Sequence, residues 1–152
     1  DAARWGRLTL SMDGSHGAAV WTVPLDAEAA EQRRADRGAA LKAALGAQAS
    51  EVYARMAQSI SEREAELDLG DFWYLSILGV DPSQQGRGLG AQLLRPVLDE
   101  ADAAGRTSFL TTFSPGNIKF YEGLGYQCRA VFPEPVTGAD FSVLIRPARS
   151  TS

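Results

Sequence analysis

A short apolar run that leads into a glycine-rich turn constrains the fold more than any other part of this sequence. The run covers residues 72–80, reads Phe-Trp-Tyr-Leu-Ser-Ile-Leu-Gly-Val and is closed by Asp81-Pro82. Nine such residues are too few for an isolated core helix, so the run predicts a central strand that is covered on both faces. After the turn, leucines recur on one helical face at positions 89, 93, 94 and 98. The sequence therefore predicts the order strand, glycine turn, helix.

The turn between these two elements carries glycine at positions 86, 88 and 90. The first N–H groups of a helix have no partner within the helix and lie at the positive end of its dipole. Glycine lets a bulky anion approach this backbone, because no Cβ stands in the way. The turn therefore predicts a binding site for a phosphate group.

Two common phosphate-binding motifs do not fit this turn. Residues 86–91 match the dinucleotide pattern G-x-G-x-x-G/A, but five residues separate Val80 from Gly86. The next predicted strand, 107–112, also ends in threonines rather than in an acidic residue that could hold a ribose. A nucleoside-triphosphate P-loop is excluded because no Gly-Lys-Ser/Thr follows the glycines.

The composition predicts one soluble globular domain over residues 1–147, with residues 148–152 as a flexible tail. The chain has 152 residues, of which 45% are hydrophobic and 22% are charged. A net charge of −4 gives no general attraction to nucleic acid or to an anionic membrane, and it suits a cationic amine better. No apolar run approaches the roughly 20 residues that span a bilayer.

The cysteine and histidine content excludes an internal disulfide and the usual zinc clusters. The sequence has one cysteine, Cys128, and one histidine, His16, so we expect no metal site and predict a cytoplasmic location. Cys128 falls in a predicted strand and is expected to be a small buried side chain. His16 lies in a turn-rich segment and is expected to be an exposed turn residue rather than a catalytic base.

The remaining segments predict an α/β (α+β) fold, with a mixed sheet and helices on its faces. Two antiparallel strands are expected over 4–10 and 18–23, joined by a glycine-rich turn. Two helices are expected over 26–45 and 48–67, with a core-facing stripe in the second at Val52, Met56 and Ile60. The further expected elements are a helix over 85–104 that Pro96 bends, a strand over 107–113, a short helix over 116–123, and a strand pair over 126–132 and 141–146.

Two motifs in the expected order resemble the GNAT family of N-acetyltransferases. Gln85-x-x-Gly88-x-Gly90 fits that family's Q/R-x-x-G-x-G/A pattern. Downstream, Ser114-Pro-Gly-Asn117 and Phe120-Tyr-Glu-Gly-Leu-Gly-Tyr126 fit the family's FYExLGF/Y ending. The resemblance narrows to puromycin N-acetyltransferase-like members on the segments 19–22, 79–90 and 115–125. It implies the family's fold, in which a mixed and mostly antiparallel central sheet carries helices on both faces.

The resemblance implies that acetyl-CoA (coenzyme A) is the acetyl donor. Backbone groups of Leu78, Gly79 and Val80 would align the pantetheine arm, and the Val80 N–H would polarise the thioester carbonyl. Tyr121 would act as the general acid toward the departing thiolate, and Asn117 would contact coenzyme A. The pyrophosphate would be held by the turn and the start of the helix, at Gln85, Gly86, Arg87, Gly88, Leu89, Gly90 and Ala91. An exposed arginine and a helix-capping asparagine are the alternative interpretations of Arg87 and Asn117.

Two departures from the family pattern leave parts of the prediction open. The family order places a strand and one or two helices before the first hairpin, whereas this sequence starts on the hairpin. Either those elements have been removed or gone unrecorded, or this is a shortened member of the family. Thr111 stands where puromycin-type enzymes carry a glutamate. No carboxylate lies within residues 72–80, so a base on that strand is unavailable unless Ser76 or Tyr74 relays a proton through water. Glu122 is expected to face solvent, so the sequence identifies no general base.

Three functions from different classes fit these observations. The first is acetyl transfer to a primary amine of a small molecule, for which an aminonucleoside antibiotic is one candidate. The second is acetyl transfer to a peptide or protein amine, and the third is a non-catalytic acyl-CoA-binding module. A closed pocket under residues 26–68 would favour a small-molecule acceptor. An open groove beside Tyr121 would favour a peptide or protein acceptor. The presence of Tyr121 argues against a non-catalytic binding module. A homodimer is compatible with the family.

Overall fold

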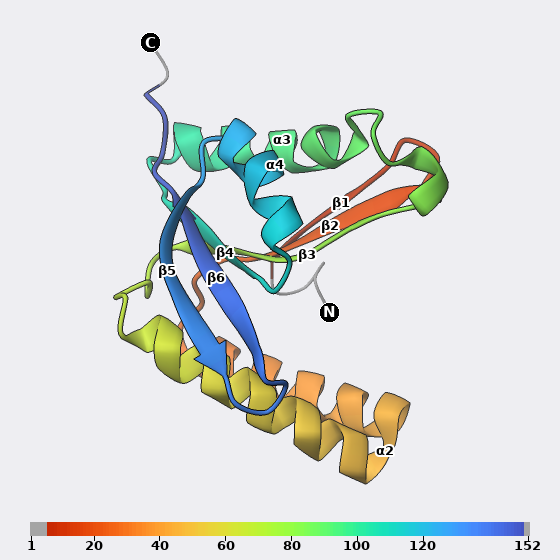
Figure 1. Ribbon diagram of the computed structural model, residues 1–152, viewed down its shortest axis with the longest axis vertical. Helices are drawn as coiled ribbons and strands as arrows, with labels where there is room; N and C mark the ends of the chain where they lie inside the picture. The colour runs from red at the N-terminus through yellow and green to blue at the C-terminus, as the bar shows by residue number, and fades with distance from the viewer. Residues whose placement is uncertain (1–5, 151–152) are drawn as a thin grey trace.

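The computed structural model describes residues 6–150 and shows a six-stranded sheet with helices on both faces (Figure 1). The first two positions of the strand predicted over 4–10 and the last two of the predicted tail lie outside the described residues. The elements in chain order are β1 (Gly6–Leu10), β2 (Gly17–Thr22), α2 (Ala27–Ala65), β3 (Trp73–Val80), η1 (Pro82–Gln84), α3 (Leu89–Ala103), β4 (Ser108–Thr112), η2 (Pro115–Asn117), α4 (Ile118–Gly123), β5 (Gln127–Glu134) and β6 (Ala139–Arg146).

The sheet is mixed and mostly antiparallel. Its strands lie in the order β1-β2-β3-β4-β6-β5, and every neighbouring pair is antiparallel except β3 and β4. A parallel pair needs a crossover connection, and α3 provides it between the end of β3 and the start of β4. The predicted fold class is therefore confirmed, with the strand predicted over 72–80 in the interior of the sheet.

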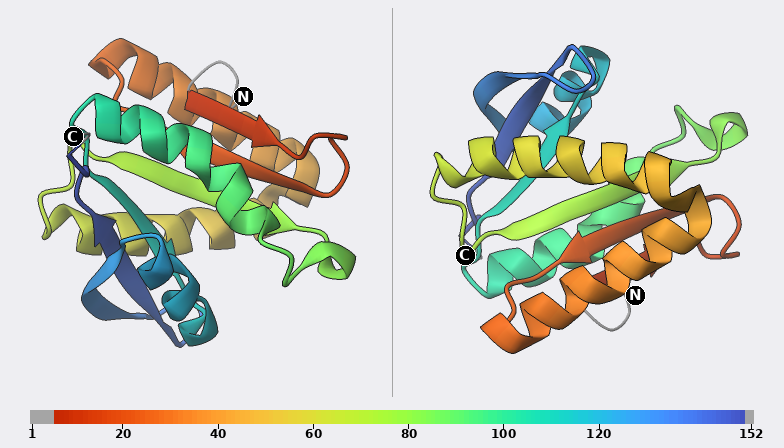
Figure 2. Two further views of the ribbon diagram at one scale, coloured as in Figure 1. Left: turned by 90° about the horizontal axis from the view of Figure 1, so that it is seen from above. Right: turned by 90° about the horizontal axis from the view of Figure 1, so that it is seen from below.

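Two helices cover one face of the sheet and α2 covers the other (Figures 1 and 2). On the face of α3 and α4, the main core contains Trp21, Leu75, Leu110, Leu93, Leu94, Val97 and Leu98. The leucines at 93, 94 and 98 that predict one helical face are thus buried together. On the other face, a smaller cluster of Leu69, Phe109, Phe141 and Val143 has Ile60 of α2 packed against it.

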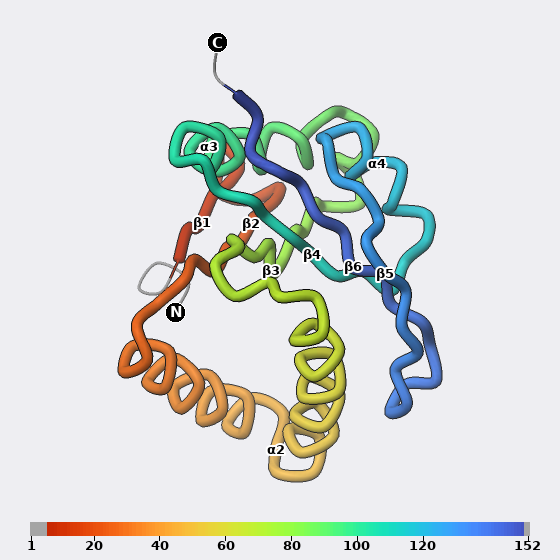
Figure 3. The backbone as a smooth tube through the Cα atoms, turned by 90° about the vertical axis from the view of Figure 1, so that its left-hand side faces the viewer, coloured from red at the N-terminus to blue at the C-terminus, as the bar shows by residue number. Residues whose placement is uncertain are grey.

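Helix α2 consists of two arms that meet in a V below the sheet (Figure 3). Gly46 lies between the arms with φ 81° and ψ 170°, a conformation that interrupts the helix and that glycine adopts readily. The two helices predicted over 26–45 and 48–67 are therefore confirmed; we call residues 27–45 the N-terminal arm and residues 47–65 the C-terminal arm. The predicted core-facing stripe is wrong at Val52, which is 41% exposed. In the described structure no residue of α2 is fully buried.

The first turn of α3 starts later than the sequence predicts. The helix begins at Leu89 rather than near Gln85, because η1 and the following turn occupy the intervening residues. Gly86 and Gly88, which lie between η1 and the helix, have left-handed backbone conformations that glycine adopts readily. The turn is therefore longer and more open than a direct strand-to-helix junction.

The C-terminal strand pair also differs from its prediction. Strands β5 and β6 are longer than expected, because the Glu134 carboxylate accepts hydrogen bonds from the N–H groups of Val136 and Thr137 and closes a tight turn between them. Cys128 on β5 is exposed, not buried, because β5 is an edge strand of the sheet. Within residues 6–150 no helix is long and apolar enough to cross a membrane.

A buried ion pair joins the last strand to α3. Arg146 is 3% exposed; its Nη1 and Nη2 donate to the two carboxylate oxygens of Asp102 at 2.7 and 2.9 Å, and its Nε donates to the Leu124 carbonyl at 2.9 Å. The Arg149 N–H also donates to Asp102, at 2.8 Å. The hydrogen bonds from Arg146 hold the pKa of Asp102 below its usual value of 3.8.

Replacing Asp102 by asparagine is expected to lower the free energy of unfolding by about 2 kcal/mol at pH 7, because it leaves the buried guanidinium without its charged acceptor. Since the pKa of Asp102 is lowered by folding, the difference from wild type should shrink as the pH falls below 3.8. Urea unfolding at pH 7 and pH 3 measures both effects. Glu100→Gln is the control, because its pair with Arg7 is exposed and should contribute less than about 1 kcal/mol.

Candidate active site

A cavity of about 550 Å3 opens where the glycine turn meets α4. Its walls come from the end of β3, the turn, the first residues of α3, and α4 with the turn before it. The lining residues are Leu78, Val80, Gln84, Gln85, Gly86, Gly88, Leu89, Gly90, Asn117, Phe120 and Tyr121. All the site residues predicted from the sequence line this cavity except Gly79, Arg87 and Ala91, and Gln84 and Phe120 join them.

The glycine turn leaves room for a phosphate group beside its backbone. Gly86 and Gly88 have φ values of +79° and +78°, and a Cβ built on either would meet no atom within 4 Å. The first hydrogen bond of α3 runs from the Gln92 N–H to the Gly88 carbonyl, at 3.1 Å. The amides before Gln92 therefore have no partner within the helix, and they fit a phosphate-bearing ligand.

A β-bulge in β3 turns two of its side chains toward this cavity. Val20 of β2 pairs with Ile77, while the next residue, Trp21, pairs with Leu75, so Ser76 is the extra residue. Before the bulge, Trp73 and Leu75 face the main core; after it, the facing residues are Leu78 and Val80. Strict alternation from Leu75 would have turned both of these side chains to the opposite face.

The backbone of Val80 has its N–H free of the sheet. The Asp81 N–H donates to the His16 carbonyl at 2.7 Å, so the antiparallel alternation points the backbone groups of Val80 away from β2. On that side β3 pairs with β4 only at Trp73 and Tyr74, and the two strands separate beyond this point. The Val80 carbonyl accepts a hydrogen bond from the Gln85 side chain at 3.2 Å instead of one from the ladder.

Tyr121 presents a largely buried phenol to the same cavity. Its ring packs edge-on against Phe120 and Tyr126, with centroid distances of 5.0 and 5.9 Å. Burial raises the pKa of Tyr121 above 10, so the hydroxyl keeps its proton at neutral pH. The neighbouring Tyr126 differs, because its hydroxyl lies 2.9 Å from the Ser108 hydroxyl and does not line the cavity.

Asn117 and Arg87, each of which had two interpretations from the sequence, differ in their positions relative to the cavity. Asn117 lines the cavity at the end of η2 and makes no side-chain capping hydrogen bond to α4, so its amide can meet a ligand. Arg87 is exposed and does not line the cavity, as expected of a solvated side chain. Glu122 is exposed, as predicted.

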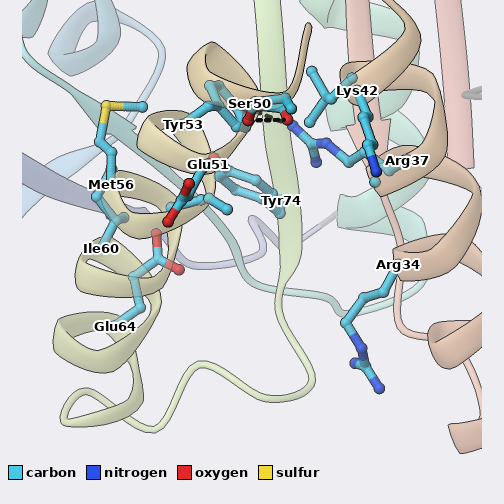
Figure 4. Close-up of a pocket in the computed structure, with 15 residues that line it drawn as sticks. Arg34, Arg37, Lys42, Ser50, Glu51, Tyr53, Met56, Ile60, Glu64 and Tyr74 are labelled. Atoms are coloured by element: carbon cyan, nitrogen blue, oxygen red, sulfur yellow. Dashed lines mark hydrogen bonds between the residues drawn. The ribbon is translucent and has the colours of Figure 1, made fainter.

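A second cavity, of about 720 Å3, lies between the two arms of α2 and β3 (Figure 4). The N-terminal arm contributes Arg34, Arg37 and Lys42, and the C-terminal arm contributes Glu51, Tyr53, Met56, Ile60 and Glu64. Tyr74 is the lining residue from the sheet, and its ring stacks on Phe109 at a centroid distance of 4.8 Å. The cavity exists because the arms diverge from Gly46 and leave their apolar positions uncovered.

Glu64 is the chemically notable residue of this second cavity. Burial raises the pKa of its carboxyl to about 7, far above the usual 4.5. The pKa of Tyr74 is raised mainly by burial, while a hydrogen bond with Thr111 acts in the opposite direction and the charge of Glu64 raises it further. Thr111 on β4 thus lies beside Tyr74, next to the point where β3 and β4 separate.

Sequence reasoning missed Glu64, although a signal for it is present. Met56 and Ile60 are four residues apart on one helical face, and Glu64 continues that spacing by another four. A carboxylate on an otherwise apolar stripe is unusual, because burying it without a partner is costly. Within residues 6–150, no group of three or more His, Cys, Asp or Glu side chains could hold a metal ion.

Residues 21–126 match the model of the family described as Acetyltransferase (GNAT) family. Solved structures share the fold at low identity. A mosquito arylalkylamine N-acetyltransferase like 5b is 19% identical over 87% of this chain and 68% of its own, with a TM-score of 0.57. Another crystal structure of an acetyltransferase is 20% identical over 93% of this chain and 69% of its own, also with a TM-score of 0.57.

The ribosomal-protein-S18-alanine N-acetyltransferase from Escherichia coli is 28% identical, over 53% of this chain, with a TM-score of 0.44. This chain covers 56% of that enzyme's chain. The family match spans the bulged strand β3, the glycine turn, α3 and Tyr121, which are the parts that build the first cavity. The chain therefore belongs to the acetyltransferase (GNAT) family, whose general reaction is acetyl transfer from acetyl-CoA.

Proposed function

We propose that this chain transfers the acetyl group of acetyl-CoA to a primary amine of a small molecule. The observation that carries the proposal is the cavity beside α4, where the open glycine turn, the free Val80 N–H and the buried Tyr121 phenol meet. A phosphate-binding turn alone would serve many cofactors. A proton donor in the same cavity suits a reaction in which a thiolate departs.

Each group in this cavity has a distinct role in the proposal. The backbone amides at the start of α3 hold the pyrophosphate, and Asn117 contacts coenzyme A. Leu78 and Val80 align the pantetheine arm along β3, and the Val80 N–H donates to the thioester carbonyl oxygen as negative charge develops there. The neutral amine nitrogen attacks the carbonyl carbon, the carbon–sulfur bond breaks, and Tyr121 gives its proton to the leaving sulfur. The proton that the acylated nitrogen loses restores the phenol of Tyr121 through solvent.

The second cavity supports a small molecule as the acceptor. This cavity lies between the arms of α2 and β3, and Tyr121 is not among the residues that line it. Apolar and aromatic residues make up most of its lining, and the charged residues are Arg34, Arg37, Lys42, Glu51 and Glu64. Apolar walls with polar groups that can orient a ligand are typical of small-molecule sites. The puromycin-type resemblance makes an aminonucleoside one candidate acceptor, although Thr111 replaces the glutamate of those enzymes.

Acetyl-CoA-dependent thiol release across a panel of amines tests the proposal. The panel contains puromycin, other aminonucleosides, polyamines, aromatic amines and short peptides. Turnover with a small amine and none with peptides is the expected result. Calorimetric binding of acetyl-CoA without turnover on any amine would contradict the proposal and indicate an acyl-CoA-binding module instead.

A further inference from the structure

The cavity between the arms of α2 carries opposite charges on its two walls. Figure 4 shows Arg37 and Lys42 on the N-terminal arm, and Glu51 and Glu64 on the C-terminal arm. Tyr74 lies between them on the sheet side. A ligand in this cavity would therefore meet a basic wall, an acidic wall and an aromatic floor.

The two charged walls do not neutralise each other. In the described part of the chain, Lys42, Glu51 and Glu64 have no hydrogen bond or ion pair with another side chain. The hydrogen bond that does cross between the arms runs from Arg37 Nη2 to the Tyr53 hydroxyl, at 3.1 Å. Arg34 is held by Glu31 on its own arm. An unpaired, half-buried carboxylate has a strong preference for a cationic partner.

We propose that this cavity receives a primary amine on an apolar, aromatic body that also bears an anionic group. Glu64 binds the ammonium end and accepts one of its protons, Tyr74, Met56 and Ile60 contact the body, and Lys42 with Arg37 binds the anion. This inference rests on the proposed acetyl transfer, for which it supplies the acceptor class and the missing proton acceptor. The released proton forms the carboxylic acid of Glu64 and then passes to solvent.

Glu64 suits this role better than Glu51. Glu51 is exposed and remains hydrated, whereas Glu64 is half buried between Ile60 and the sheet side of the cavity. The pKa of about 7 allows Glu64 to accept a proton near neutral pH. The other charged and titratable groups that line the cavity are Tyr74 from β3, Arg34, Arg37 and Lys42 from the N-terminal arm, and Glu51 and Tyr53 from its own arm.

Strand β3 connects this cavity with the cofactor cavity. Tyr74 lies at the floor of the cavity between the arms of α2. Leu78 lines the cavity beside α4, about 13 Å further along the strand at 3.3 Å per residue. Between them are the bulge at Ser76 and the point where β4 separates from β3. An amine that has given a proton to Glu64 must therefore leave that side chain and move along β3 to reach the cavity beside α4.

Three related probes test the inference: para-aminoethylbenzoate, which has an amine and a carboxylate at opposite ends of an aromatic ring; its methyl ester; and phenethylamine. The wild-type protein should bind para-aminoethylbenzoate at least about tenfold more tightly than the methyl ester or phenethylamine, which lack the carboxylate. Calorimetric dissociation constants and KM values both measure this difference. Glu64→Gln should weaken the binding of all three amines by about tenfold or more. Lys42→Gln should weaken only the carboxylate-bearing probe.

The dependence of kcat/KM on pH tests the role of Glu64 as a proton acceptor, because a purely structural role would leave this dependence unchanged. In wild type, kcat/KM should rise as the pH passes 7, because Glu64 must be ionised to accept a proton. Glu64→Gln should lose that limb. The variant should also melt at a higher temperature than wild type at pH 8, since the buried charge is removed, which confirms that it folds. Glu62→Gln is the matched control, because Glu62 is exposed on the same arm and should leave binding and the pH profile unchanged.

The outcomes separate the inference from the proposed function. If acetyl-CoA binds and amines are acetylated, but Glu64→Gln keeps the wild-type affinity and pH profile, the inference is wrong and the acetyltransferase stands. If no amine is acetylated, the proposed function fails, and calorimetric binding of the probes still decides the inference. Binding that Glu64→Gln abolishes would support the cavity as an amine site, and absence of binding to wild type would overturn it.

Discussion

Replacing Gly88 by valine is expected to weaken acetyl-CoA binding by at least about a hundredfold, because the substitution strains the turn and fills the phosphate cradle. Gly88 has φ +78° and ψ 7° at the N-cap of α3, a left-handed conformation that a β-branched residue rarely adopts. A side chain there would meet no protein atom within 4 Å, so it would enter the open space beside the turn. Calorimetry with acetyl-CoA measures the effect.

Gly105→Val separates lost affinity from backbone strain. Gly105 lies just beyond the other end of α3, also with a positive φ of +65° and no atom within 4 Å of a built Cβ. It does not line the cavity beside α4. This control should lower the melting temperature about as much as Gly88→Val and leave the dissociation constant of acetyl-CoA unchanged. Equal losses of affinity in both variants would show that strain alone is responsible and that the turn does not hold the ligand.

Tyr121→Phe is expected to lower kcat by about a hundredfold and to leave the dissociation constant of acetyl-CoA within about twofold of wild type. Phenylalanine keeps the edge-on packing against Phe120 and Tyr126 and removes only the hydroxyl. The departing thiolate must then take its proton from water, which makes the chemical step slower. Single-turnover measurements of thiol release, together with acetyl-CoA binding, distinguish a slower reaction from weaker binding.

The matched control for this experiment is Tyr126→Phe. The Tyr126 ring is also buried and its hydroxyl lies 2.9 Å from the Ser108 hydroxyl, so the substitution should cost about 1 kcal/mol of stability with little change in kcat. Burial raises the pKa of Tyr126 to about 12, so its hydroxyl is neutral over the whole range of the assay. A wild-type kcat in Tyr121→Phe would remove Tyr121 from the proposed mechanism.

Local sequence patterns were sufficient for most of the elements and for most of the residues that line the cavity beside α4. The nine-residue apolar run predicted β3, and the glycines predicted the turn after it. Gly46 divides α2 because its backbone has a positive φ that few other residues adopt. The cavity beside α4 could be predicted because its residues come from two short segments with strong local signals.

The packing of α2 could not be predicted in the same way. The four-residue spacing of Val52, Met56 and Ile60 predicts a core stripe, yet Val52 is exposed and the other two line a cavity. Helical spacing shows which residues share a face, but it does not show how far that face stands from its neighbour. That separation depends on the direction of the two arms beyond Gly46, which many weak contacts decide together.

The sequence by itself determined the order of the elements, the position of the glycine turn and the position of Tyr121, because each follows from residue types within a few positions of one another. Only the tertiary structure decided that Ser76 forms a bulge, that β3 and β4 separate after Tyr74, and that Glu64 and Lys42 line one cavity from different arms of α2. These features depend on register and on the distance between segments remote in the chain. The raised pKa of Glu64 has the same origin, since it comes from burial created by α2 and the sheet together.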